Sequence, residues 1–240
     1  MGGFLMSVNQ LFAYHCTRIL GKRIVILAVC LIVLLAGFCQ QPRFSLATDL
    51  GVQHSFKQEQ RYSAIGQTVN LHFSFTAKEG AYFGFSYYSF GKFTNNPTAT
   101  AKSVVTLPQE INYTNYGSMR YKCMSLGWKH YIKGSFDADQ FWNLYGYAGF
   151  GLMLGSIENT HSVVIDTTDY YVPVKSGTAN FKRLTLDLAM GWEVPLGGYV
   201  YLYSEGRVWI PTTDYPSRFL FVNKNAPLMG ALNLGVRILF

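Results

Sequence analysis

The last thirteen residues of the chain, LMGALNLGVRILF, constrain its fold more than any other stretch. Every second residue there is bulky and apolar, namely Leu232, Leu234, Val236, Ile238 and Phe240. Alternation with a period of two predicts a strand with one apolar face and one more polar face. The ends of soluble chains are normally frayed, so a terminal aromatic residue on the apolar face is unusual there. It is typical of a strand that closes a membrane barrel and places its last side chain at the lipid–water boundary.

The composition of the whole chain agrees with this interpretation. Of the 240 residues, 49% are apolar and 16% aromatic. Only 14% are charged, against about 25% in a typical soluble domain. After residue 39 no run reaches the roughly 18 apolar residues that a membrane helix needs. The apolar residues therefore belong to strands, and a barrel that faces lipid accounts for both the composition and the pattern.

The one long apolar run, residues 24–38, lies near the start of the chain behind Arg18, Lys22 and Arg23. Gly37 and Cys39 precede a candidate cleavage site before Gln40. A basic flank, a short apolar core and small residues at the cut are typical of a secretory signal peptide. We therefore expect residues 1–39 to be a cleaved signal peptide and residues 40–240 to form one barrel domain. An uncleaved anchor helix is the alternative, although the run is short for a membrane span.

Charge and cysteine content exclude several classes of function. Residues 1–39 contain three of the 20 Lys and Arg and none of the 13 Asp and Glu, which leaves a mild net charge of +4 for the remainder. Nucleic-acid binding requires a concentrated basic face, so we expect no nucleic-acid partner. Cys123 alone remains after cleavage, so we expect no disulfide framework. No cluster of residues has metal-ligand spacing, and we expect no cofactor and no metal.

Eight segments are predicted to be strands: residues 43–53, 67–76, 81–90, 118–132, 141–154, 181–194, 199–210 and 228–240. One parity is bulky and apolar, whereas the other is rich in Gly, Ser, Asn and Tyr. Residues 81–90 are apolar on both parities, so the facing of this strand stays open. The connections alternate between long and short, and the shortest are 77–80 and 195–198.

Outer-membrane barrels have an even number of strands, short periplasmic turns and long outer loops. We therefore predict an all-β, eight-stranded, antiparallel, up-and-down transmembrane barrel. A soluble lipocalin-like barrel is the alternative, but it would place the apolar parity inside. Trp128, Trp142, Trp192 and Tyr199 fall near predicted strand ends, where interfacial aromatic residues lie in membrane proteins.

The candidate signal peptide, the Gly- and Tyr-rich alternating strands and the terminal Phe240 resemble the small outer-membrane β-barrel domain proteins of the Bacteroidetes. These are similar in architecture to the OmpA and OmpX type barrels. The resemblance covers residues 43–240 and is one of pattern. It implies export by the general secretory route and insertion into outer-membrane lipid of a bacterium. It also implies that the barrel-assembly machinery recognises the terminal strand through Leu232, Leu234, Val236, Ile238 and Phe240.

The polar parities predict a network inside the barrel that consists of Asp49, His72, Lys129, Asp187, Glu193, Glu205, Arg207 and Arg237. An eight-stranded barrel is just wide enough for side chains to fill it, and buried charges are costly unless they are paired. We expect ion pairs among Glu193, Glu205, Arg207 and Arg237, with Asp49 or Glu205 as the partner of Arg237. The network is expected to plug the lumen, and a gated pore is the alternative.

A hydrolase site at His72 and Ser74 is not expected, because same-face side chains two residues apart on a strand lie about 7 Å from each other. We therefore expect a structural or surface-interaction protein without catalysis. The long outer loops, 91–117 and 155–180, are expected either to be solvated without a partner or to bind an envelope protein. A narrow pore for small solutes and an accessory barrel of a secretion or gliding apparatus remain alternatives.

Overall fold

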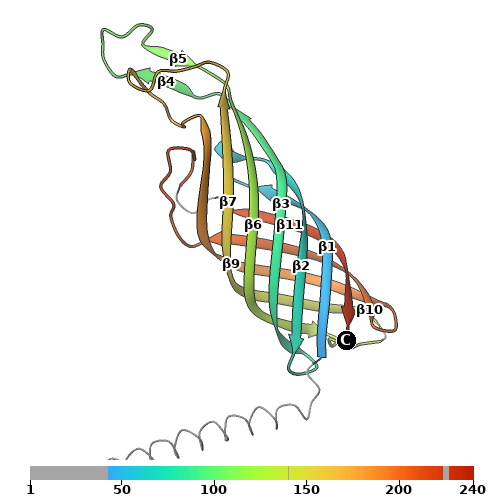
Figure 1. Ribbon diagram of the computed structural model, residues 1–240. Coiled ribbons are helices and arrows are strands. Elements are labelled where there is room, and N and C mark those ends of the chain that lie inside the picture. Colours follow the sequence, from blue (N-terminus) through green and yellow to red (C-terminus); the bar gives the residue numbers. More distant parts are fainter. Residues whose placement is uncertain (1–42, 140, 224–226) are drawn as a thin grey trace, which may run out of the picture. The chain divides into compact units, whose positions relative to one another are not determined.

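The structure is a computed structural model that describes residues 43–139, 141–223 and 227–240 (Figure 1). The predicted signal peptide, residues 1–39, lies outside the described residues. Eight antiparallel strands close into a barrel in the order β1-β11-β10-β9-β7-β6-β3-β2. They are β1 (Arg43–Ser55), β2 (Ser63–Ser74), β3 (Glu79–Asn95), β6 (Asn115–Lys133), β7 (Asn143–His161), β9 (Gly177–Gly197), β10 (Val200–Pro211) and β11 (Met229–Leu239). The predicted fold class is therefore confirmed.

The terminal strand closes the cylinder. β11 pairs with β1 in a register that places Ile238 beside Leu46 and Leu232 beside Val52. Phe240 extends the seam beyond the strand, because its amide donates a hydrogen bond to the Phe44 carbonyl at 2.8 Å. The last residue is thus fixed to the barrel wall. In the part of the chain that the structure describes, no helix is long and apolar enough to cross a membrane.

The two parities of each strand separate by polarity: the polar residues face the inside of the barrel and the apolar residues face outward, the reverse of a soluble protein. On β10, Tyr201, Tyr203 and Glu205 are buried inside the barrel, whereas Val208 and Ile210 on the other parity are exposed. Leu126 and Leu232 on the outer wall are 62% and 73% exposed. The lipocalin-like alternative requires the opposite arrangement, and the observed burial contradicts it.

Inward tyrosines and a bulge after Tyr88 together make residues 81–90 apolar on both parities. Tyr82 and Tyr88 on β3 point inward, whereas the phenylalanines between them are exposed on the outer wall. The register with β6 shifts between Tyr88 and Gly91. Phe90 adopts a φ of 63° at this point, and the inward parity changes from even to odd residues beyond it. The direction of the side chains beyond Phe90 therefore depends on this bulge, which period-two alternation does not reveal.

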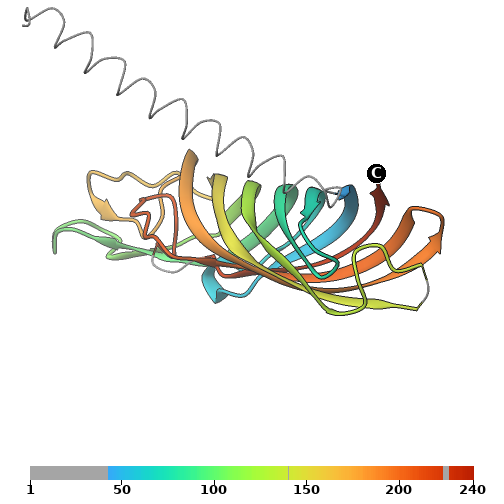
Figure 2. The same ribbon diagram turned by 90° about the horizontal axis from the view of Figure 1, so that it is seen from below.

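The strands differ in length, and the longest project beyond one end of the barrel. β3, β6, β7 and β9 have 17 to 21 residues, whereas the other four have 11 to 13. A small sheet of β4 (Thr98–Ala101), β5 (Glu110–Asn112) and β8 (Tyr170–Tyr171) continues this projection. Both views place β4 and β5 far from the C-terminus (Figures 1 and 2). β7 and β9 pair with each other well into the segment 155–180, which was predicted to be a loop.

The connections follow the predicted alternation with one exception. At the C-terminal end lie 75–78, 134–142 and a tight turn at Gly197 and Gly198, which adopt φ values of +120° and +59°. At the other end lie 56–62, 96–114, 162–176 and 212–228. The connection 56–62 is shorter than the one between the predicted strands 43–53 and 67–76, because β2 begins at Ser63. A 3-10 turn, Gln58–Gln60, fills much of it.

Candidate functional site: the barrel lumen

The structure buries all eight side chains of the predicted lumen network, each with at most 4% of its surface exposed. Arg183 on β9 is a ninth member, 1% exposed, which was not predicted. Arg183 and Asp187 lie an even number of positions apart on the same strand, so the alternation that predicted Asp187 to face the lumen also applies to Arg183. With Arg183 included, the buried charged groups among the described residues are four acids and four bases, besides His72. Their formal charges therefore balance.

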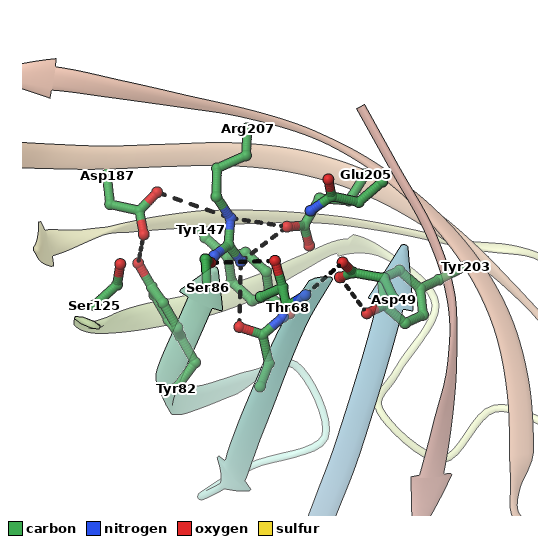
Figure 3. Close-up of polar contacts among 12 residues, drawn as sticks. Asp49, Thr68, Tyr82, Ser86, Ser125, Tyr147, Asp187, Tyr203, Glu205 and Arg207 are labelled. Atoms are coloured by element: carbon green, nitrogen blue, oxygen red, sulfur yellow. Dashed lines mark hydrogen bonds and ion pairs between the residues drawn. The ribbon is translucent and has the colours of Figure 1, made fainter. Parts of the chain in front are cut away.

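Arg207 lies at the centre of the first cluster (Figure 3). Its Nε donates to Glu205 Oε1 at 3.0 Å, and its Nη2 forms an ion pair with the same oxygen at 2.9 Å. The Nε also lies 3.9 Å from Asp187 Oδ1. Nη2 also donates to Asn70 Oδ1 at 3.3 Å. One guanidinium group therefore faces two carboxylates, from β9 and β10, and an amide from β2. Charge-assisted hydrogen bonds of this kind are about twice as strong as neutral ones.

Tyrosine hydroxyls complete the first cluster by donating to the acids. Tyr203 Oη donates to Asp49 Oδ2 at 2.8 Å, and the Thr68 amide donates to Asp49 Oδ1 at 3.1 Å. Tyr82 Oη donates to Asp187 Oδ2 at 3.2 Å (Figure 3). Buried carboxylates need such donors because water does not solvate them. The inward tyrosines thus provide the polar contacts that a carboxylate has in water.

The second cluster contains Arg237 and Glu193, nearer to the C-terminal end of the barrel. The two side chains form a bidentate pair, with Nη2 to Oε1 at 2.8 Å and Nε to Oε2 at 3.0 Å. Lys129 Nζ lies 3.9 Å from the same carboxylate. The expectation that Arg237 pairs with Asp49 or Glu205 is therefore wrong. Both of those acids already have partners in the first cluster, and the Arg237 guanidinium instead extends over the Tyr201 ring, 4.0 Å from its centroid.

Both ring nitrogens of His72 are hydrogen-bonded to hydroxyl groups and neither to a carboxylate. Its Nδ1 is hydrogen-bonded to Ser45 Oγ at 3.2 Å and its Nε2 to the Tyr147 hydroxyl at 2.6 Å. Ser74, on the same strand, is not among its partners. Among the described residues, no group of three His, Cys, Asp or Glu side chains could hold a metal ion. His72 thus completes the polar lining of the lumen.

The half of the lumen nearer the long loops is apolar and aromatic, which the polar parities did not predict. Its core contains Tyr62, Tyr88, Met119, Tyr121, Met153, Ile157, Phe181, Trp209, Leu220 and Met229. Leu220 comes from the connection 212–228, which Arg183 holds by donating to the carbonyls of Thr213 at 3.1 Å and Asn223 at 2.7 Å. A connection folded into the barrel therefore closes this end by packing.

A shorter connection reaches into the opposite end. Phe136, in 134–142, is 8% exposed, and its amide donates to the Ala77 carbonyl at 3.0 Å. Its own carbonyl accepts a hydrogen bond from Arg237 Nη2 at 2.8 Å. The charged clusters thus lie between the aromatic half on one side and the Phe136 turn on the other.

No protein-family model and no curated protein matches this sequence. Among solved structures, Neisserial surface protein A is similar with a TM-score of 0.52 and 11% identity, over 81% of this chain and 96% of that chain. The attachment invasion locus protein of Yersinia pestis has a TM-score of 0.47 and 12% identity, over 84% and 100%. A major outer membrane protein from Thermus thermophilus has 0.46 and 13%, over 81% and 99%. At these identities the similarity concerns the fold alone, a closed eight-stranded antiparallel barrel like those of outer-membrane proteins.

Proposed function

We propose that the protein is an integral barrel of a bacterial outer membrane with a side-chain-filled lumen and a structural or surface-interaction role without catalysis. The observation that carries this proposal is the exposed apolar belt around a charged interior. Soluble monomers rarely expose contiguous apolar patches larger than a few hundred Å². Here exposed apolar side chains occur on every barrel strand, for example Leu50, Ile65, Phe83 and Phe150. Lipid is the solvent that such a surface requires.

The height of the belt matches a membrane. On the outward face of β6, only Met124, Leu126 and Trp128 lie between Lys122 and His130. This interval corresponds to about 27 Å along a strand, or about 20 Å along the axis of a barrel whose strands tilt by roughly 40°. The apolar band of known outer-membrane barrels is about 25 Å tall.

Aromatic side chains gather at the C-terminal rim of the belt. Phe75 and Trp128 stack with ring centroids 5.2 Å apart, and Phe44 and Phe240 approach to 6.0 Å. Trp192 is also exposed near this rim. Interfacial girdles have this composition, and the short turns lie at the same end. The proposal therefore places this rim at the periplasmic interface, where the assembly machinery would recognise the terminal strand.

The opposite end then faces the cell exterior with its projecting strands. β5 and β8 are the outer strands of the small sheet. Edge strands can pair with a strand of a partner, which is the physical basis for a surface-interaction role with an envelope protein.

Heat-modifiable gel migration after refolding into lipid vesicles tests the barrel, and membrane fractionation tests its location. We expect a folded band that shifts on boiling and recovery with the outer membrane. Absence of both would refute the proposal. Planar-bilayer recordings test the filled lumen, and sustained large open states would favour the pore alternative instead.

A further inference from the structure

A cationic hollow lies at β6, β7 and β9, and its lining includes the lumen-core residues Tyr121 and Phe181 besides outward side chains. Its volume is ≈ 610 Å³. The charged residues that line it are Arg120, Lys122 and Lys182, and no acid lines it. Leu154 and Tyr87 supply an apolar and aromatic part of its surface.

Strand register brings these residues together. Tyr87 pairs with Lys122, Lys122 with Leu154, and Leu154 with Lys182 across four adjacent strands. Directly opposed side chains in a sheet lie about 5 Å apart, so the two lysines flank Leu154 at about 10 Å from each other. Arg120 belongs to the next outward row, where it opposes Ser156. Three cations from two strands therefore surround one short segment of β7.

The three cations lack a counter-charge from the protein. Within the described residues, none of them forms an ion pair. The nearest outward acid on β7 is Glu158, one row beyond Ser156 and opposite Ser118. Like charges about 10 Å apart or closer repel one another, and an anion bound between these cations would relieve that repulsion.

The hollow lies at the outer rim of the apolar belt. One row closer to the membrane centre, the outward residues opposed across the same four strands are all apolar: Phe85, Met124, Leu152 and Leu184. A ligand that contacts both rows needs an anionic head and apolar tails. A soluble anion would contact the cations only.

We infer that this hollow binds the phosphate-bearing headgroup of a membrane lipid, whose acyl chains lie along the apolar row beneath it. Lysine and arginine both recognise phosphate, arginine as a fork and lysine as a point charge. The inference rests on the proposed function, because it requires the belt to lie in a membrane.

The test uses the full barrel refolded in detergent, with diphosphoryl lipid A as the probe and native mass spectrometry as the readout. Dephosphorylated lipid A and inositol hexakisphosphate serve as the lipid-only and phosphate-only comparisons. The variant Lys122→Gln/Lys182→Gln removes the cations that flank Leu154. Lys78→Gln/Lys133→Gln removes equal charge from exposed positions at the opposite rim. Each protein is first checked for its heat-modifiable band, which reports on the proposed function separately.

We expect the wild type to retain diphosphoryl lipid A and the Lys122→Gln/Lys182→Gln variant to bind it about tenfold more weakly, with the control variant unchanged. Retention should also fall in about 0.5 M salt, because salt screens exposed charges. Equal retention of the dephosphorylated lipid, or an equal loss in the control variant, would overturn the inference. Tight binding of inositol hexakisphosphate at the same lysines would overturn the assignment to a lipid. If the protein shows any of these contrary results but its band still shifts on boiling, the lipid site is refuted and the proposed function is not.

Discussion

Replacement of Arg207 by Met should destabilise the barrel more than any single neutralisation of the acids around it. The guanidinium group contacts Glu205 at 2.9 Å and Asp187 at 3.9 Å, and all three side chains are fully buried. Arg207→Met therefore leaves two carboxylates without their cation, which costs about 3–5 kcal/mol. Glu205→Gln leaves Arg207 beside Asp187 and Asn70, so its cost is that of one charge-assisted hydrogen bond, about 1.5–3 kcal/mol.

The compensated variant Arg207→Met/Glu205→Gln/Asp187→Asn distinguishes lost charge pairing from lost packing. It retains the shape of the cluster without unpaired charges, so its free energy of unfolding should lie within about 1–2 kcal/mol of the wild type. Urea titration in lipid vesicles, with the fraction of heat-modifiable band as readout, gives all three values. The reasoning is refuted if Glu205→Gln costs as much as Arg207→Met, or if the triple variant is no more stable than Arg207→Met.

Three further predictions concern the wall, the terminus and an outer connection. Gly191→Ala should cost about 1–3 kcal/mol of stability, because a Cβ there meets the Tyr145 ring at 2.5 Å. Gly206→Ala, whose nearest contact is at 3.8 Å, should change stability by less than about 0.5 kcal/mol in the same titration; equal effects would contradict this. Phe240→Ala should lower the amount of folded barrel in cells while the refolded protein keeps its stability, and unchanged cellular assembly would exclude a signal role. Two hydrogen bonds from Thr168, each at 2.7 Å, hold the pKa of Asp166 below its usual value. This turn should therefore be ordered above the ordinary aspartate pKa and lose order as the pH falls through the lowered one. The Thr168 amide resonance reports this change, and Asp166→Asn should abolish its pH dependence.

Period-two alternation predicted the barrel because lipid imposes a simple rule on its strands. In the proposed membrane barrel, the outward residues of the belt meet hydrocarbon and the inward residues meet a narrow interior, so Leu232 and Arg237 differ in parity for one physical reason. The prediction of a strand over residues 228–240 followed directly from this rule.

The rule fails where the strands leave the belt. β7 continues to His161 and β9 begins at Gly177, but the predicted strands covered only 141–154 and 181–194. Beyond the belt no lipid selects apolar outward residues, so the outward pattern fades. Met153, Ile157 and Phe181 then point inward and make the outer half of the lumen apolar. The eight residues of the predicted polar network therefore fill only part of the lumen.

Individual ion pairs could not be predicted from the sequence, because they depend on how far each side chain extends across the lumen as well as on its parity. Arg237 and Glu193 lie on strands separated by β10. Their contact requires the guanidinium to cross the Tyr201 ring, which the register sets and parity does not. Parity therefore predicted eight members of the lumen network, but neither Arg183 nor the partner of Arg237.

The division of the lumen into two halves bears on what the charges do. A path for ions through the barrel would have to cross the segment around Met119, Met153 and Leu220, whose apolar side chains offer a dehydrated ion few ligands. It would also have to displace the 212–228 connection, which Arg183 holds through two carbonyls. Charges that line a conduction path need contact with water at both ends. The guanidinium groups of Arg207 and Arg237 are instead paired with buried carboxylates from neighbouring parts of the wall, which suits a role in fixing the register of the strands around them.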